Sequence, residues 1–214
     1  IGDGTTLPST LVFDHPTARG LARFVASEGP MPSVVSADRP AILDIGVSVA
    51  CVRAVLPGGA RGLSRAWRLA ATGSDAFGPS PSTRWDSEAS TVRHGAFLLG
   101  AELFDNGSFG VSPAEASTMD PQQRLLLELG YDALHGAGLP RDKLVESSTA
   151  VFVGVMSTEF ASVQLHSNAY SMTGVGHCFA SGRLSYALGL HGACESIDVA
   201  CSSALVACHN AHRA

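Results

Sequence analysis

Residues 198–205 read DVACSSAL, in which a single cysteine, Cys201, stands between an apolar stretch and a run of small residues. A cysteine at the corner between a strand and a helix would lie at the helix N-terminus, where the dipole and the free backbone N–H groups favour the thiolate. The thiolate is a nucleophile, and the N–H of the same residue can face an oxyanion during acyl transfer. The small neighbours permit a tight corner similar to a nucleophile elbow, although the G-x-S-x-G spelling is absent.

Two other interpretations of Cys201 remain open at this point. Free cysteines are among the most buried residues in proteins, so Cys201 could be a small packing residue beside a helix. Spacing and flanking residues alone do not separate this interpretation from the nucleophile. A zinc site would have to use the nearby thiols and imidazoles of Cys194, Cys208, His209 and His212. The absence of a C-x-x-C pair argues against zinc, and the two histidines are expected to be packing or surface residues.

The elements that must position Cys201 are a strand before it and a helix after it. Residues 195–200 predict a short strand, and residues 202–212 predict a helix. A further helix is expected from about residue 178 to residue 190. The segment TAVFVGVMS, residues 149–157, is almost continuously apolar, which is expected of a strand in a sheet covered on both faces.

The clearest helix is the segment MDPQQRLLLELGYDALHGAGL, residues 119–139. Asp120 suits the N-cap and Pro121 suits the first turn, while Gly138 can close the C-terminal end. Apolar residues recur at every fourth position and predict the buried stripe. These residues are Leu125, Leu129, Ala133 and Ala137.

The remaining sequence completes an α/β pattern. We expect a buried strand at residues 41–50, a short amphipathic helix around residues 63–70, and a loop at residues 79–86. The alternation of strand and helix places residues 41–214 in the α/β class. Residues 1–28 predict a small helical unit that is too short to hold a core alone, and residues 29–40 are rich in proline and serine and indicate a linker.

Composition excludes several classes of protein. The chain has 214 residues, is 45% hydrophobic and 15% charged, and is therefore globular. A net charge of -5 without a basic run argues against nucleic acid and anionic membranes as partners. The longest apolar stretch, residues 41–56, carries Asp44 and Arg53, which argues against a membrane span. Five cysteines at loose spacing favour a reduced, cytoplasmic setting, although a targeting segment upstream of Ile1 is compatible with the sequence.

In combination, several segments resemble the β-ketoacyl synthases, the condensing domains of modular polyketide synthases and type I fatty acid synthases. IDVACSSALVACH resembles the active-site segment of that family, and MDPQQRLLLELGYDALHGAGL resembles its DPQQR helix. Further matches are FDNGSFGVSPAEASTMDPQQR, VFVGVMSTEF, ASGRLSYALGLHG and LPGG followed by a tryptophan and RWD. The resemblance covers about residues 40–214.

The first segment carries a second resemblance. LPSTLVFDHPTARGLARFV is similar to the last third of the acyl carrier protein domain of a polyketide synthase. This implies residues 1–28 as the tail of a carrier domain, residues 29–40 as a linker, and residues 41–214 as the N-terminal half of a ketosynthase. The serine that carries 4'-phosphopantetheine would lie before Ile1, and the chain itself is expected to bind no cofactor and no metal.

The resemblance implies a thiolase-like fold of five layers (α-β-α-β-α), of which this chain holds the N-terminal half, and a homodimer. It implies an acyltransferase that performs a decarboxylative Claisen condensation, with Cys201 as the covalent nucleophile. Acyl carrier protein domains, acyl thioesters and malonyl-type thioesters are the expected partners. The family's catalytic histidines would lie downstream, so these residues alone are expected to be inactive. The alternatives are a ketosynthase-like domain that holds or transfers acyl groups without condensing them, and a thiolase-like hydrolase or acyltransferase.

Overall fold

A computed structural model describes residues 24, 47–82, 84, 91–157, 159–163 and 168–214. The chain divides into two compact units, residues 1–46 and residues 47–214. In the first unit only Phe24 is described, and it is helical, as expected for the small helical unit. The other residues of the expected carrier tail, 1–28, and the whole linker, 29–40, lie outside the described residues.

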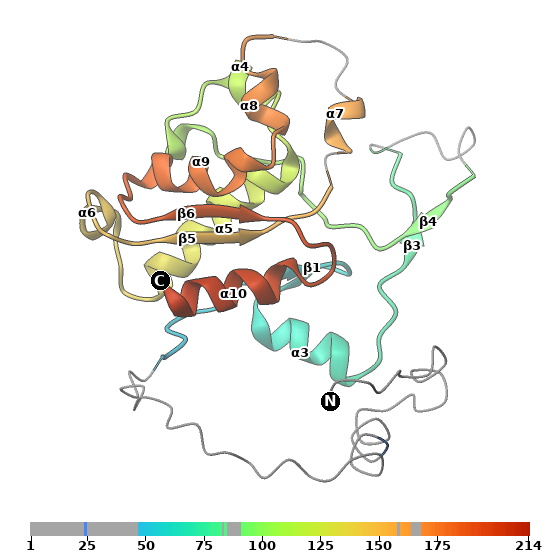
Figure 1. The fold of residues 1–214 in the computed structure, drawn as a ribbon. Helices are drawn as coiled ribbons and strands as arrows, with labels where there is room; N and C mark the ends of the chain where they lie inside the picture. Colours follow the sequence, from blue (N-terminus) through green and yellow to red (C-terminus); the bar gives the residue numbers. More distant parts are fainter. Residues whose placement is uncertain (1–23, 25–46, 83, 85–90, 158, 164–167) are drawn as a thin grey trace, which may run out of the picture. The chain divides into compact units, whose positions relative to one another are not determined.

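The second unit consists of short strands and helices (Figure 1). Two small antiparallel pairs precede the main part of the fold, with Val55 opposite Arg61 in one and Gly78 opposite Gly95 in the other. In chain order the elements are β1 Val55–Leu56, β2 Ala60–Arg61, α3 Leu63–Ala71, β3 Gly78–Pro79, β4 His94–Gly95, the 3-10 turn η1 Gly107–Phe109, α4 Pro113–Ala116, α5 Pro121–Gly136, α6 Arg141–Leu144, β5 Val151–Gly154, α7 Phe160–Val163, α8 Ser171–Val175, α9 Cys178–Leu188, β6 Cys194–Ile197 and α10 Ser203–Arg213.

The parallel pair β5 and β6 forms the centre of the fold, with Val151 opposite Cys194 and Gly154 opposite Ile197. Helix α9 covers one face of the pair and α10 covers the other (Figure 1). Successive side chains of a strand point to opposite faces, and β6 follows this rule. The Ser196 hydroxyl lies 2.9 Å from the Ser181 hydroxyl of α9, while Glu195 accepts a hydrogen bond of 3.2 Å from Asn210 of α10. The strand expected at residues 149–157 is confirmed as β5, which contacts a helix on each face.

The core lies between the sheet and helices α5 and α9, which pack against each other. Alternate residues of the β5 strand and its extension, Val151, Val153 and Val155, are buried there. Their partners from the helices include the fully buried Leu127 and Leu188. This α-β-α arrangement fixes the carboxyl ends of β5 and β6, which lie at the same edge of the sheet because the strands are parallel.

Helix α5 confirms the predicted ends but not the predicted stripe. The Asp120 carboxylate accepts the Gln122 N–H at 2.8 Å, and Gly138, with a φ of 81°, follows the end of the helix. The buried residues are Gln123 and Leu127, whereas the predicted set of Leu125, Leu129, Ala133 and Ala137 is only half-buried. The stripe was wrong because a buried polar residue, Gln123, occupies part of the inner face.

Two other predictions need correction. The described part of the expected strand at residues 41–50 has no strand partner, and Val47 and Val49 are 68% and 79% exposed, so the apolar run is neither paired nor buried there. Residues 41–46 of that prediction lie outside the described residues. The strand expected at residues 195–200 ends at Ile197, because the next residues turn to begin α10. The predicted helices at residues 63–70, 178–190 and 202–212 are confirmed as α3, α9 and α10.

Gly154 is the point at which α10 approaches the sheet most closely. A Cβ atom at this position would lie 2.6 Å from the backbone N of Ala204 and 2.7 Å from the carbonyl carbon of Ser203. Both are backbone atoms of the first turn of α10, so a side chain there requires the whole helix start to move.

We therefore expect Gly154→Ala to lower the free energy of unfolding by about 1–3 kcal/mol, as overpacking commonly does. The measurement is chemical denaturation followed by circular dichroism. Gly182→Ala is the matched control, because a Cβ at Gly182 meets nothing within 4 Å and alanine favours a helix interior. If both variants unfold at the same denaturant concentration as the native protein, the close approach at Gly154 does not constrain α10.

Candidate active site at the turn before α10

The turn between β6 and α10 is fixed first by Asp198. Its Oδ1 accepts the backbone N–H of Ala200 at 3.1 Å, a local turn that aspartate commonly forms. Ala200 has a φ of 57°, in the left-handed region that residues other than glycine rarely adopt. The sharp change of direction therefore occurs one residue before Cys201, and Asp198 supports it.

Two serines complete the turn. The buried Ser203 hydroxyl accepts the Val199 N–H at 2.9 Å and donates to the Ala200 carbonyl oxygen at 2.6 Å. The Ser202 hydroxyl donates to the Val199 carbonyl oxygen at 2.9 Å. These bonds satisfy backbone groups where the strand ladder has ended and the helix has not begun. The serines thus shape the helix start.

Cys201 lies at this corner, two residues before the first residue of α10, and its side chain is exposed. The interpretation of Cys201 as a buried packing residue is therefore wrong for this structure. Helix α10 has 11 residues, which is long enough to present a helix dipole to its N-terminus. The geometry matches the predicted order of strand, turn and helix.

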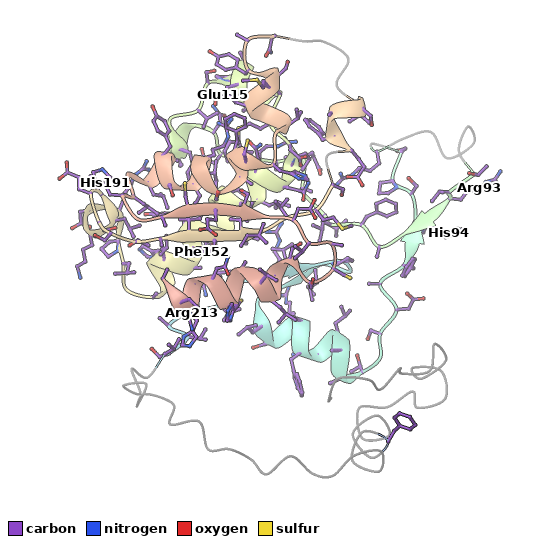
Figure 2. The ribbon with its side chains drawn as sticks, in the orientation of Figure 1. Arg93, His94, Glu115, Phe152, His191 and Arg213 are labelled. Atoms are coloured by element: carbon purple, nitrogen blue, oxygen red, sulfur yellow. The ribbon has the colours of Figure 1, made fainter. Side chains whose placement is uncertain are left out.

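The sulfur and imidazole groups proposed as an alternative zinc site are not gathered. Within the described residues, no group of three or more His, Cys, Asp or Glu side chains could hold a metal ion. His209 and His212 are exposed on α10, which confirms their assignment as surface residues. Arg213, labelled in Figure 2, is the last residue of α10. At a rise of about 1.5 Å per residue, this end of the helix lies roughly 15 Å from the end beside Cys201. His191, labelled in the same view, precedes the amino end of β6, opposite to the end that leads to Cys201.

One histidine, His177, does lie beside the turn, and the sequence argument did not single it out. It is the N-cap residue of α9, and its side chain is 25% exposed. Its Nε2 lies 2.5 Å from the Ser157 carbonyl oxygen, and its Nδ1 lies 3.9 Å from Oδ2 of Asp198. Its only sequence signal is a histidine among small residues at the start of a predicted helix.

The nearby Glu159 adds negative charge. The Ser157 hydroxyl lowers the pKa of Glu159 by hydrogen bonding to its carboxylate, with a smaller contribution from His177. The edge of the sheet near Cys201 therefore combines one imidazole with two carboxylates, Asp198 and Glu159.

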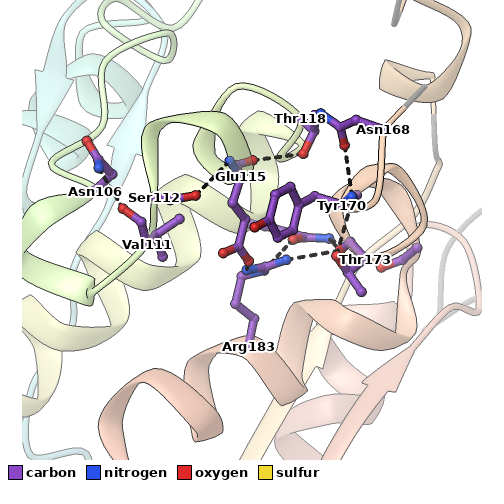
Figure 3. Close-up of polar contacts among 11 residues, drawn as sticks. Asn106, Val111, Ser112, Glu115, Thr118, Asn168, Tyr170, Thr173 and Arg183 are labelled. Carbon is purple, nitrogen blue, oxygen red and sulfur yellow. Dashed lines mark hydrogen bonds and ion pairs between the residues drawn. The ribbon is translucent and has the colours of Figure 1, made fainter. Parts of the chain in front are cut away.

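A second polar cluster holds the scaffold above the sheet (Figure 3). The Arg183 guanidinium donates to Glu115 at 2.5 Å, to Gln123 Oε1 at 2.8 Å and to the Thr173 carbonyl oxygen at 3.3 Å. The Gln123 amide in turn donates to the carbonyl oxygens of Thr173 and Gly176 at 3.1 and 3.3 Å. The cluster thus joins helices α4, α5, α8 and α9. The sequence prediction missed this cluster. Its signal is Gln123, which lies four residues before the buried Leu127 and therefore on the same inner face of α5.

Among the described residues, every helix is too short or too polar to cross a bilayer.

Comparison with known proteins gives a consistent family. The family model described as "Beta-ketoacyl synthase, N-terminal domain" matches residues 46–214. Polyketide synthase GfsB of Streptomyces halstedii is 39% identical over 99% of this chain. The spectinabilin polyketide synthase system protein NorA' of Streptomyces orinoci is 40% identical over 96% of the chain. The chain spans only 4% and 6% of the lengths of these two relatives.

Solved structures agree with this result. The ketosynthase from module 6 of the bacillaene synthase of Bacillus subtilis 168 superposes with a TM-score of 0.64 at 32% identity, over 76% of this chain and 28% of that chain. The oxazolomycin ketosynthase domain OzmH KS7 of Streptomyces albus JA3453 gives a TM-score of 0.65 at 28% identity, over 77% and 31%. The predicted thiolase-like fold is thereby confirmed for the N-terminal half of such a domain. The chain belongs to the β-ketoacyl synthase family, and its relatives are polyketide synthases.

Proposed function

We propose that this chain supplies the nucleophile of a polyketide synthase ketosynthase, and that the nucleophile is Cys201. The observation that carries the proposal is the exposed thiol at the corner between β6 and α10. The helix start favours negative charge on the sulfur, and the backbone N–H of Cys201 is proposed as half of the oxyanion hole. Membership of the β-ketoacyl synthase family supports the same assignment.

The proposed reaction has two stages. The Cys201 thiolate attacks the carbonyl carbon of an acyl thioester on a carrier protein; the bond from that carbon to the phosphopantetheine sulfur breaks, and the carrier thiol takes up a proton. A malonyl-type thioester on a second carrier then loses CO2 to give an enolate. The enolate carbon attacks the acyl-Cys201 carbonyl, the new carbon–carbon bond forms, and the Cys201 thiolate leaves. The product is a β-ketoacyl thioester that is two backbone carbons longer.

We assign to Cys201 only the nucleophilic part of this sequence. The matched family model is that of an N-terminal domain, so we propose that the groups promoting decarboxylation belong to the C-terminal part of the ketosynthase. The chain itself is proposed to bind no cofactor; 4'-phosphopantetheine enters with the acyl carrier protein partners.

We further propose that residues 1–28 are the tail of a carrier domain, that residues 29–40 are a linker, and that the ketosynthase begins at residue 41. The 99% coverage of this chain by the alignment to GfsB supports a continuous match through this region. A homodimer is proposed from the family resemblance. A reduced cytoplasmic setting is proposed because all five cysteines are free.

The proposal is tested in the protein that carries these 214 residues. We expect incubation with a short acyl thioester to add one acyl group, found by mass spectrometry on the peptide that contains Cys201. Iodoacetamide should likewise modify Cys201 before Cys51, Cys178, Cys194 and Cys208. Acylation of another cysteine, or equal alkylation of all five, would contradict the assignment. Acylation of Cys201 without any condensation product would identify a domain that holds or transfers acyl groups.

A further inference from the structure

His177 faces a hydrogen-bond acceptor at each of its ring nitrogens. Nε2 points to the Ser157 carbonyl oxygen at 2.5 Å, and Nδ1 lies 3.9 Å from Oδ2 of Asp198. The imidazole therefore hydrogen-bonds to the Ser157 carbonyl through one nitrogen and lies beside the Asp198 carboxylate with the other.

The first of these contacts ties His177 to the rigid scaffold. Ser157 follows the carboxyl end of β5, and its φ of 71° lies in the left-handed region. Its carbonyl oxygen accepts a second hydrogen bond of 3.2 Å from Gln122 Nε2. The backbone N–H of Gln122 in turn donates to the carboxylate of Asp120, which caps α5. Asp120 is only 5% exposed. The ring is therefore anchored to the ends of β5 and α5.

The second contact reaches the turn that presents Cys201. Asp198 uses Oδ1 to accept the Ala200 N–H at 3.1 Å, and it turns its other oxygen, Oδ2, toward His177. One carboxylate thus supports the left-handed Ala200 and faces the imidazole at the same time. His177 and Asp198 thus connect the ends of β5 and α5 to Ala200, the residue before Cys201.

We infer that His177 is a positioning residue for Cys201, which acts by holding Asp198 and the turn at Ala200 in place. This inference rests on the proposed function, since it matters only if Cys201 is the nucleophile. Without the His177 side chain, Asp198 loses the group that lies beside its second carboxylate oxygen and is free to leave Ala200.

The test compares native protein with His177→Gln, using the protein that carries the whole sequence. Glutamine keeps an N–H donor near the Nε2 position for the Ser157 carbonyl but brings no ring nitrogen to Asp198. The rate constant for iodoacetamide alkylation of Cys201 is measured by mass spectrometry, with Cys208 as the reference thiol in the same molecule. We expect His177→Gln to lower the Cys201 rate about 5–10-fold, the effect of one lost polar contact, and to change the Cys208 rate by less than about twofold.

A double-mutant cycle with Asp198→Asn separates positioning from a general structural role. Asparagine keeps an acceptor for Ala200 but carries no charge, so in this background His177→Gln should change the Cys201 rate by less than about twofold. Additive effects of the two substitutions would overturn the inference. Equal Cys201 rates in native protein and His177→Gln would also overturn it. If native protein shows no preference for Cys201 at all, the proposed function itself fails, which is a different result.

Discussion

Replacement of Cys201 by alanine is expected to remove acyl loading and lower the rate of β-ketoacyl formation by at least about 1,000-fold. The loss is this large because the Cys201 sulfur is the atom that we propose to carry the covalent acyl intermediate. The measurement is β-ketoacyl product formed by the protein that carries this sequence, together with the mass of the Cys201 peptide after incubation with an acyl thioester.

The fold should tolerate this change, because the Cys201 side chain is exposed and makes no packing contact that alanine would remove from a core. The free energy of unfolding is expected to stay within about 0.5 kcal/mol of the native value, as for other surface substitutions. Cys208→Ala is the matched control, since Cys208 is also an exposed cysteine on α10. Condensation at the native rate in Cys201→Ala, or loss of condensation in Cys208→Ala alone, would show that another residue is the nucleophile.

Replacement of Arg183 by methionine is expected to have the largest effect on stability, about 3–5 kcal/mol. Methionine fills much of the same volume but leaves the partly buried Glu115 without its cation and Gln123 without a donor to its oxygen. The Arg183 side chain is only 11% exposed, so solvent screens the interaction little. The measurement is the free energy of unfolding from urea denaturation.

Two controls make the Arg183 result specific. Arg84→Met removes the cation of a more exposed pair, in which Glu102 is 62% exposed, and should cost no more than about 1 kcal/mol. The double variant Arg183→Met with Glu115→Met should be more stable than Arg183→Met alone, because no unpaired carboxylate remains. Equal losses in the Arg183 and Arg84 variants would show that burial does not strengthen the Arg183 cluster.

Elements whose signals are local could be predicted from the sequence. The ends of α5 depend on Asp120, Pro121 and Gly138, which act within a few residues of the helix ends. The turn at Cys201 was predictable for the same reason, because Asp198 and the two serines bond to backbone groups no more than four residues away.

Patterns that depend on distant partners were less well predicted. The apolar residues at 47–50 have the composition of a strand, but a strand forms only where another strand offers hydrogen bonds. The inner face of α5 was misassigned because Gln123 is buried by bonds to Arg183 and to the carbonyl oxygens of α8, which are 50 or more residues away in the chain.

By itself the sequence determined the family resemblance, the α/β class and the choice of Cys201 as the candidate nucleophile. Cysteine chemistry, capping residues and small-residue corners are properties of short segments, so they can be recognised along the chain. Only the tertiary structure decided that the Cys201 thiol is exposed and that His177 lies between Ser157 and Asp198. Those three residues are about 20 positions apart from one to the next, and the parallel pairing of β5 and β6 brings the two strand ends to one edge beside the start of α9.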